Sequence, residues 1–469
     1  MAKNIDSIFF DITPKIEELA LKCEQNNAIE KELYTKYEVK RGLRDLNGKG
    51  VLAGLTNISD VCASKIVDGK SVPCEGNLYY RGYNIKDLVR GFLEADHPGF
   101  EETAYLLLFG ELPNKAQLEE FQNMIAERRM LPPNFVRDVI MKAPSRDMMN
   151  SITRSILQLY SYDEKADDTS IPNVLRQCLN LISQFPMLMV YGYHAYNYRR
   201  GEDLYIYAPK AELSTAENIL MMLREDRKYT KLEAEILDMA LVLHMDHGGG
   251  NNSTFTTHVV TSSGTDTYST IAAAMASLKG PKHGGANRQV LAQFSLIKQT
   301  VRDWKEDDAV ADCVGRILRR ELGDGSGLIY GMGHAVYTLS DPRTVILRQS
   351  ARTLAAQRGM LDELELMEAV ERVTPRVFAE VTGHEKVMCA NVDMYSGLIY
   401  QMLDIPPDLF TPLFAVARIT GWCAHRMEEV LTGGRLYRPA YKSLTRHREY
   451  IPMAARTYRK NPLPAEKRD

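Results

Sequence analysis

The sequence predicts a mainly α-helical protein with two domains. Apolar residues recur with the 3.6-residue period of an α-helix along much of the chain. Strand-like patterns are sparse, and no alternation of strands with helices is sustained. In addition, 469 residues are more than one hydrophobic core usually organises, so two domains are expected.

The N-terminal half of the chain contains three segments with a predicted structure. Residues Ile12 to Leu21 predict an amphipathic helix that packs on the body of the protein or on a dimer mate. Short β-like pieces lie between Gly50 and Asp68. The most apolar stretch, Ile182 to Tyr193, is interrupted by Pro186 and is far shorter than the roughly 20 residues that a membrane-spanning helix needs. No transmembrane segment is therefore predicted.

Two helices are predicted in the middle of the chain. Lys231 to His244 carries its apolar residues on one helical face and is followed by three glycines that end the helix. Ser269 to Leu278 is rich in alanine, which permits close helix packing, and ends before Gly280 and Pro281. Thr257 to Thr261 fits either a strand or a helix.

The C-terminal half contains a loop and a turn. Gly323 to Gly327 is expected to form a mobile loop, and Pro406-Pro407 marks a turn after a helix that contains Asp393. Both predictions follow from residues that favour turns over regular structure.

Charge, cysteine content and the first residues restrict the class of protein. Lysine and arginine number 58 against 61 acidic residues, a net charge of -3, so neither nucleic acid nor an anionic membrane is an expected partner. The seven cysteines form no CxxC pair, which argues against a zinc cluster or a disulfide framework and favours a reducing compartment. Residues 1–11 lack the apolar core of a secretory signal, so a cytoplasmic protein is expected.

Four glycine-containing segments carry the candidate chemistry. Glycine next to a polar residue permits a tight turn and close approach of a ligand to the backbone. Each of the four segments also holds a His or an Asp: Leu243 to Asn252, Gly280 to Asn287, Gly331 to Tyr337, and Asn391 to Gly397. Arg343 follows His334 by nine residues, so a proton donor lies near a group that binds anions. This pairing indicates a small carboxylate substrate and proton-coupled chemistry.

In this order and at these separations, the four segments resemble those of citrate synthases. The resemblance spans roughly residues 41 to 445 and is supported by Tyr80 to Tyr83, by Ala417-Arg418, and by Arg438-Pro439 twenty residues later. It implies the all-α, two-domain citrate synthase fold. The large helical domain would comprise residues 1–284 and 397–469, with a helical N-terminal extension of residues 1–40, and residues 285–396 would form the smaller inserted domain.

The resemblance implies an acyltransferase of the tricarboxylic acid cycle that condenses acetyl-CoA with oxaloacetate and water. Asp393 would remove a proton from the acetyl methyl group, and His283 would donate a hydrogen bond to the enolate oxygen. His334 would protonate the ketone of oxaloacetate, and the citryl thioester would then be hydrolysed. Burial beside apolar neighbours would raise the pKa of Asp393 unless a cation compensates. The alternative for Asp393 is a helix N-cap.

The same resemblance assigns a group of residues to oxaloacetate: His247, Arg343, Arg418 and Arg438. Arginine binds carboxylates bidentately and stays charged, which suits a dicarboxylate. Arg435 competes with Arg438 for its role, and His244 is expected to be a structural residue at a helix end. In the family the arginine that matches Arg438 reaches the neighbouring subunit's site, which implies a homodimer.

The motifs give weaker support to the residues that would contact CoA. Arg41, Lys282 and the backbone of Gly331 and Gly333 match the family's CoA-binding positions. Many family members also carry a basic residue just after the reactive histidine, but here residues 335–338 are Ala, Val, Tyr and Thr. No cofactor and no metal are implied, because acetyl-CoA is a substrate.

Three alternatives stay open. A 2-methylcitrate synthase would use propionyl-CoA, and one methylene in an acyl pocket changes binding by only about 1 to 3 kcal/mol. A metal-dependent hydrolase would use His244, Asp246 and His247 as ligands, although no HExxH motif is present. A helical scaffold would use its arginines to dock acidic partners, but these arginines are dispersed among acidic residues.

Overall fold

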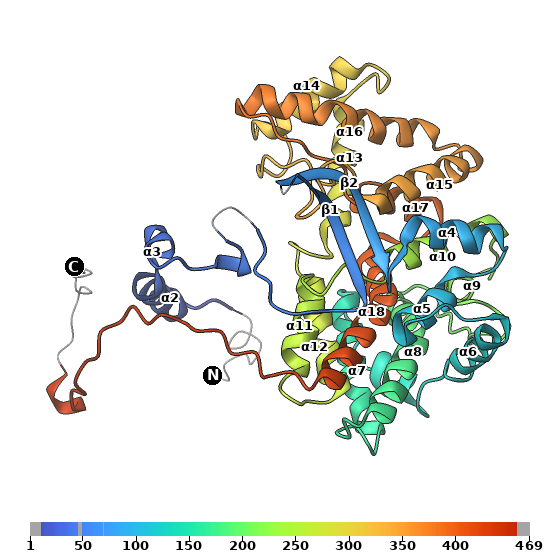
Figure 1. Cartoon of the computed structure of the whole chain (residues 1–469), viewed down its shortest axis with the longest axis horizontal. Coiled ribbons are helices and arrows are strands. Elements are labelled where there is room, and N and C mark those ends of the chain that lie inside the picture. The colour runs from blue at the N-terminus through green and yellow to red at the C-terminus, as the bar shows by residue number, and fades with distance from the viewer. Residues whose placement is uncertain (1–10, 46–48, 69, 457–469) are drawn as a thin grey trace. The chain divides into compact units, whose positions relative to one another are not determined.

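The computed structural model describes residues 11–45, 49–68 and 70–456, and it is mainly helical (Figure 1). The chain forms two compact units, one of residues 1–54 and 438–469 and the other of residues 55–437. Within its described residues, the first unit contains two helices, α2 (Pro14–Asn27) and α3 (Lys31–Lys36), and two 3-10 turns, η1 (Arg41–Leu43) and η5 (Met453–Ala455). Helix α2 confirms the predicted N-terminal helix, but none of its residues is buried.

The unit of residues 55–437 contains the remaining helices and all three strands of the described chain. In order, its elements are β1 (Ser59–Val67), β2 (Lys70–Tyr80), β3 (Tyr83–Asn84), α4 (Ile85–Glu94), α5 (Gly99–Phe109), α6 (Lys115–Glu127), η2 (Val136–Ile140), α7 (Met148–Leu159), η3 (Tyr160–Tyr162), α8 (Ile171–Arg199), α9 (Thr215–Leu223), α10 (Lys231–His244), α11 (Asn252–Thr261), α12 (Thr267–Lys279), α13 (Ala286–Thr300), α14 (Asp307–Leu318), α15 (Pro342–Arg358), α16 (Leu361–Thr382), α17 (Asp393–Met402), η4 (Pro407–Leu409) and α18 (Phe410–Thr432).

The core of this unit is built around α18. From Phe410 to Arg426 its residues are buried, and it packs against α5, α8, α10, α11 and α12. A second group of contacts joins α14 to α16, and both α13 and α15 to α17. Helix α15 also contacts α10, α4 and β2, so the two groups meet at α15. The boundaries of the smaller domain, expected at residues 284 and 397 from the family resemblance, remain predictions.

The three strands form a small antiparallel sheet in the order β1, β2, β3. Ser59 pairs with Tyr80 and Val67 with Lys70, and the register shifts between Cys62 and Ser64. Strand β1 lies within the β-like region predicted between residues 50 and 68. Strand β2 contains Pro73 and Gly76, which weaken a strand pattern, and Pro73 pairs with Ser64 beside the register shift, where proline is tolerated.

Helix α8 runs through Pro186 without a break, contrary to the interruption predicted from the sequence. A proline inside a helix removes one backbone hydrogen bond and costs about 3 kcal/mol or more. Here the residues on both sides, from Leu181 to Tyr191, are almost all buried. Burying several such side chains contributes about 1.5 to 3 kcal/mol each, which exceeds that cost.

Among the described residues, no helix combines the length and apolar character required to cross a membrane.

The two predicted central helices are confirmed, and local capping explains their starts. Thr230 caps α10 by accepting a hydrogen bond from the N–H of Glu233, whose side chain accepts one from the N–H of Thr230. Asp266 caps α12 by accepting a hydrogen bond from the N–H of Ser269. Thr257 to Thr261 is helical, because it belongs to α11. The hydroxyl of Thr257 donates to the carbonyl of Ser253 (3.0 Å), an arrangement that threonine adopts within helices.

Candidate active site

Two of the predicted histidines lie face to edge in the unit of residues 55–437. The ring centroids of His247 and His334 are 5.1 Å apart. Tyr337 stacks on His334 at 4.7 Å and lies 5.5 Å from His247. His247 follows the end of α10, whereas His334 lies in the loop before α15, so the fold brings together two motifs that are 87 positions apart in the chain.

Hydrogen bonds determine which nitrogen of His334 carries the proton. Its Nδ1 accepts hydrogen bonds from the backbone N–H groups of Val336 and Tyr337, both at 3.0 Å. Burial, followed by the charge of Arg343, lowers the pKa of His334 to about 4. The ring is therefore neutral near pH 7 and carries its proton on Nε2. This nitrogen can donate a hydrogen bond to a substrate oxygen.

The loop of His334 is fixed to the segment that precedes Asp393. The N–H of Gly333 donates to the carbonyl of Cys389 (2.8 Å), and the N–H of Asn391 donates to the carbonyl of Gly331 (2.9 Å). Gly331 has a φ of +87°, and a Cβ at this position would lie 2.7 Å from the sulfur of Met394. Only glycine fits here without strain.

Asp393 is the first residue of α17 and is partly buried. Burial raises its pKa to about 6, although the nearby Arg343 opposes the rise. This agrees with the rise expected from the sequence. The alternative of a helix N-cap is wrong, because Val392 holds the N-cap position and no side chain caps the helix. The carboxylate of Asp393 therefore remains available to accept a proton.

Arg343 is buried and paired with Asp341. Its Nε and Nη2 donate to the two carboxylate oxygens of Asp341, at 3.0 and 2.7 Å. Burial alone would lower the pKa of Arg343, but the Asp341 carboxylate reverses this effect and raises it. Asp341 also caps α15 by accepting from the N–H of Arg343. The Arg343 guanidinium thus keeps its proton, and its charge acts on His334 more strongly than the opposing charge of Asp341.

Arg418 is a fully buried cation that no carboxylate contacts through a described hydrogen bond. Its Nε donates to the carbonyl of His244 (2.7 Å), and its Cζ lies 4.7 Å from the ring centre of Phe414. Burial lowers its pKa to about 10, with Asp246 opposing. Among the described residues, its buried Nη1 has no hydrogen-bond partner. A buried guanidinium N–H without an acceptor is costly, so this group is suited to an anionic ligand.

His247 and His244 behave differently although both are buried. His244 donates from Nδ1 to the carbonyl of Ala240 (2.7 Å), which supports its expected role as a structural residue at the helix end. The Nε2 of His247 has no hydrogen-bond partner among the described residues. Burial, followed by the charge of Arg343, lowers the pKa of His247 well below its ordinary value, so the ring is neutral. It joins Arg418 Nη1 as a second buried polar group suited to a ligand.

His283 is held by a short chain of hydrogen bonds. Its Nε2 lies 3.0 Å from the hydroxyl of Ser253, which also accepts from Trp422 Nε1 (3.1 Å) and lies 3.0 Å from Asn251 Oδ1. The single hydroxyl proton of Ser253 points to either Asn251 or His283. If it points to His283, the ring proton sits on Nδ1, the nitrogen that Ser253 does not contact. Burial lowers the pKa of His283 to about 4.

Three of the predicted residues are exposed in the structure. Arg41 and Arg438 belong to the unit of residues 1–54 and 438–469, and both are exposed. The guanidinium of Arg41 lies over the ring of Tyr34 at 4.7 Å. Lys282 is exposed within the turn between α12 and α13. The substrate contacts expected of these three residues remain predictions.

The arrangement does not support the alternative of a hydrolase metal at His244, Asp246 and His247. His244 uses Nδ1 for a backbone carbonyl, and the Asp246 carboxylate faces Ser59 and His425. Within the described part of the chain, the residues close enough to share an ion are a different set.

Several residues of the site were not singled out from the sequence. Tyr337 is the last residue of one glycine-containing motif and Ser253 directly follows another, so this neighbourhood was the available signal. Tyr80 was noted only as part of the Tyr80 to Tyr83 motif. Its buried hydroxyl lies 3.1 Å from the carbonyls of Val242 and Asp246 and accepts from the N–H of Asp246 (3.2 Å), which holds the turn before His247.

The site as a whole combines three kinds of group. It has two buried cations, neutral imidazoles that can donate hydrogen bonds, and a carboxylate with a raised pKa. Such a set can bind a small anion and move a proton from a weak carbon acid. A cavity of about 720 Å³ also lies between α5, α6, α9 and α10, but none of the predicted site residues lines it.

Comparison with known proteins identifies the relatives of the chain. The model of the citrate synthase C-terminal domain family matches residues 45–440. A citrate synthase from Synechocystis is 36% identical over 388 residues, which cover 81% of this chain and 89% of the relative. A 2-methylcitrate synthase from Corynebacterium glutamicum is 31% identical and covers 90% of this chain and 99% of its own length.

A solved structure agrees with these sequence matches. The citrate synthase of Thermoplasma acidophilum was solved as a ternary complex with carboxymethyl coenzyme A and oxaloacetate. It aligns with a TM-score of 0.72 and 26% identity over 89% of this chain and 100% of that chain.

Proposed function

The chain belongs to the citrate synthase family, and from this premise we propose that it condenses acetyl-CoA with oxaloacetate and water to give citrate and CoA. One observation carries the proposal. The buried Nη1 of Arg418 and the buried Nε2 of His247 both lack a hydrogen-bond partner within the described chain. A keto dicarboxylate offers these two donors the acceptors that they need.

Oxaloacetate is proposed to bind at His247, Arg343 and Arg418. A carboxylate at Arg418 would provide the hydrogen-bond acceptor that the guanidinium lacks. Arg343 remains charged because of Asp341 and attracts a second negative charge. The proton on His334 Nε2 would be directed at the ketone oxygen of the substrate.

Asp393 is proposed to begin the reaction by removing a proton from the methyl group of acetyl-CoA. A carboxyl with a pKa of about 6 is a stronger base than an ordinary aspartate and is still mostly ionised at pH 7. His283 would donate from Nδ1 to the thioester oxygen, which requires the Ser253 hydroxyl to donate to His283 Nε2. The thioester is thereby held as an enolate whose oxygen accepts a hydrogen bond from His283.

Condensation and hydrolysis complete the proposed reaction. The enolate carbon attacks the ketone carbon of oxaloacetate, and the ketone oxygen takes the proton of His334 Nε2. Water then cleaves the citryl thioester, which releases CoA and citrate. General acid–base steps of this type each contribute roughly 10²- to 10⁴-fold.

Other parts of the proposal rest on the family resemblance. Arg41, Lys282, Gly331 and Gly333 would contact CoA, and Arg438 would reach the neighbouring subunit's site in a homodimer. The Thermoplasma relative was solved with a CoA analogue and oxaloacetate, which supports small-molecule substrates of this class. All seven cysteines are free thiols, which supports a place in the reducing cytoplasm.

The second candidate substrate is propionyl-CoA, because the Corynebacterium relative is a 2-methylcitrate synthase and matches over nearly its whole length. The test is the release of free CoA thiol from acetyl-CoA and, separately, from propionyl-CoA, each with and without oxaloacetate. Faster release from acetyl-CoA that requires oxaloacetate is expected. Faster release from propionyl-CoA would move the assignment to 2-methylcitrate synthase.

Two variants of the chain make this test specific. Asp393→Asn removes the proposed base and should reduce the release by at least about 10²-fold. Asp303→Asn is the matched control, because Asp303 is exposed and its Oδ1 accepts from the N–H of Lys305, which asparagine can also do. Equal activity of the two variants would contradict the role of Asp393.

A further inference from the structure

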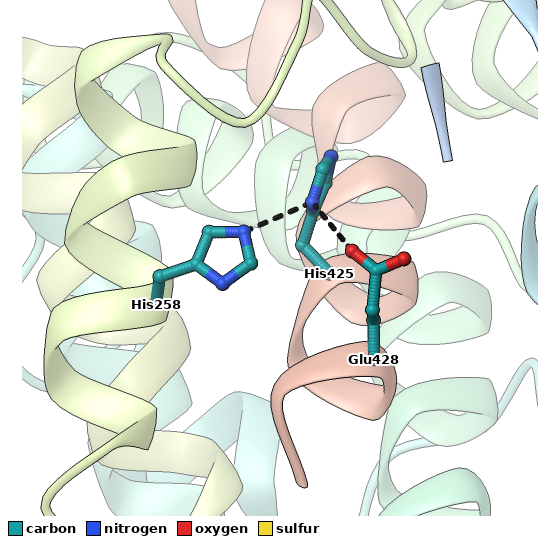
Figure 2. Close-up of side chains that lie close together, drawn as sticks. All are labelled: His258, His425 and Glu428. Carbon is teal, nitrogen blue, oxygen red and sulfur yellow. Dashed lines mark hydrogen bonds and ion pairs between the residues drawn. The ribbon is translucent and has the colours of Figure 1, made fainter. Parts of the chain in front are cut away.

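A second cluster of chemically active side chains lies outside the site described above. It consists of His258 on α11 and of His425 and Glu428 on α18 (Figure 2). His258 Nε2 lies 3.1 Å from His425 Nδ1, and His425 Nδ1 lies 3.9 Å from Glu428 Oε2. The two histidines are buried, and the Glu428 side chain is 10% exposed. Three potential ligand atoms therefore face one another in a mostly buried place.

Each imidazole of the cluster has a carboxylate on its other side. His258 Nδ1 donates to Glu429 Oε2 (2.7 Å). His425 Nε2 lies 3.3 Å from Asp246 Oδ1. This distance suits an ion pair, but the two atoms are not aligned for a hydrogen bond. Histidines that bind metals commonly direct their other nitrogen at a carboxylate, which fixes the ring and increases the basicity of the ligand nitrogen. Both rings of this cluster have that arrangement.

Glu428 provides an independent observation. Its Oε1 accepts from the N–H of Asn57 (2.7 Å), which orients the carboxylate. Its Oε2 is buried and has no hydrogen-bond partner within the described chain. A buried carboxylate oxygen without a partner is costly, so this atom is suited to a cation between Glu428 and the two rings.

The charges within the cluster also favour a cation, although two arginines outside it act on its carboxylates, Arg418 on Asp246 and Arg81 on Glu428. Three carboxylates, from Asp246, Glu428 and Glu429, surround two imidazoles. Metal binding requires neutral imidazoles, and a divalent ion then balances two of the three negative charges. Without an ion, supplying the same positive charge within the cluster would need both buried histidines to be protonated, yet their facing nitrogens lie 3.1 Å apart, where at most one proton fits.

We propose that His258 Nε2, His425 Nδ1 and Glu428 Oε2 bind a divalent transition-metal ion of the zinc class. Two imidazoles and one carboxylate suit zinc better than magnesium or calcium, which prefer oxygen ligands. In a tetrahedral zinc site with bonds of 2.0–2.1 Å, ligand atoms lie about 3.4 Å apart. The spacings of 3.1 and 3.9 Å lie close to this value.

Gly249 leaves room for a fourth ligand. A Cβ at this position would lie 3.7 Å from both His258 Nε2 and His425 Cε1, so a larger side chain would cover the two rings.

The proposed metal site would have a structural role. It joins α11 and α18 to Asn57, just before β1, and through Asp246 it reaches the turn that carries His247. This inference is independent of the proposed citrate synthase activity.

The test is metal binding by the full chain, freed of metal with a chelator and then dialysed against Zn²⁺. One equivalent of Zn²⁺ per chain is expected by mass spectrometry of the metal content. The variant Glu428→Gln should bind at least about tenfold more weakly, and Glu429→Gln, which changes the carboxylate behind His258, about 10- to 100-fold more weakly. His384→Gln is the matched control for binding at surface histidines, because His384 is exposed.

The unaltered chain provides a measurement that does not depend on variants that fold. Loaded with Co²⁺, a site with these ligands should give the intense visible absorption of four-coordinate Co²⁺, and Zn²⁺ should displace it. A weak six-coordinate spectrum, the absence of binding, or equal Zn²⁺ affinity in Glu428→Gln would overturn the proposal. The cluster would then be a hydrogen-bonded pair of histidines.

Discussion

Replacing Asp393 by asparagine is expected to stabilise the folded chain although it removes the catalytic base. Burial raises the pKa of Asp393 to about 6, whereas an aspartate in the unfolded chain has a pKa of about 3.9. At pH 8 the group is ionised in both states, and this difference of about two pKa units destabilises the folded state by about 3 kcal/mol. Because the side chain keeps some exposure, this value is an upper bound.

The sign of the pH dependence follows from the raised pKa. The folded chain binds the proton of Asp393 more tightly than the unfolded chain does. The destabilisation is therefore complete above about pH 6, declines as the pH falls through 6, and vanishes below about pH 4. Asparagine is neutral throughout, so its advantage over aspartate should be largest at pH 8 and should fall to about a third of that value at pH 4.5.

Thermal unfolding of both chains at pH 8 and pH 4.5, at one ionic strength, measures this effect. The melting temperature of Asp393→Asn should exceed that of the unaltered chain at pH 8, and the difference should shrink at pH 4.5. Asp303→Asn, which changes an exposed carboxylate, should show no such pattern. A melting temperature that is unchanged or lower at pH 8, or an equal gain at both pH values, would refute the reasoning about the burial of Asp393.

Three further predictions concern catalysis. The kcat/KM for acetyl-CoA should fall about tenfold from pH 7 to pH 5, because Asp393 must be ionised and has a pKa of about 6; an ordinary aspartate would give almost no change in a pH–rate profile. Arg418→Met should raise the KM for oxaloacetate roughly 10- to 100-fold in steady-state assays, because a charge-assisted hydrogen bond is lost; an unchanged KM would remove Arg418 from the site. Ser253→Ala should lower kcat roughly tenfold with little effect on the KM for oxaloacetate, because in the proposed mechanism the Ser253 hydroxyl donates to His283 Nε2 and fixes its tautomer; a change in KM alone would contradict this role.

Local sequence patterns predicted the helices whose start, apolar face and end are all encoded nearby. Helix α10 begins at a Thr–Glu capping box and ends before three glycines, and it has the predicted bounds. Helix α8 differs because the burial that compensates for Pro186 comes from distant segments, above all α18. Thr257 to Thr261 was ambiguous because β-branched residues favour strands unless tertiary packing places them in a helix.

The residues of the site divide in the same way: short contiguous motifs reveal some of them, and only the fold reveals the others. The glycine-containing motifs identified His247, His283, His334 and Asp393, because each motif is contiguous. The partners that fix their chemistry are remote or were hidden in the motifs, as with Trp422, which lies 169 positions from Ser253. No spacing rule in the sequence pairs these two residues. The same holds for His258 and His425, which are 167 positions apart.

The most direct test of the proposed reaction is the identity of its product. The chain would be incubated with oxaloacetate and acetyl-CoA that carries ¹³C in its methyl carbon, and the products would be identified by mass spectrometry. Citrate with one label, together with an equal amount of free CoA, is the predicted result. Labelled acetate with unchanged oxaloacetate would show thioester hydrolysis without condensation and would contradict the account.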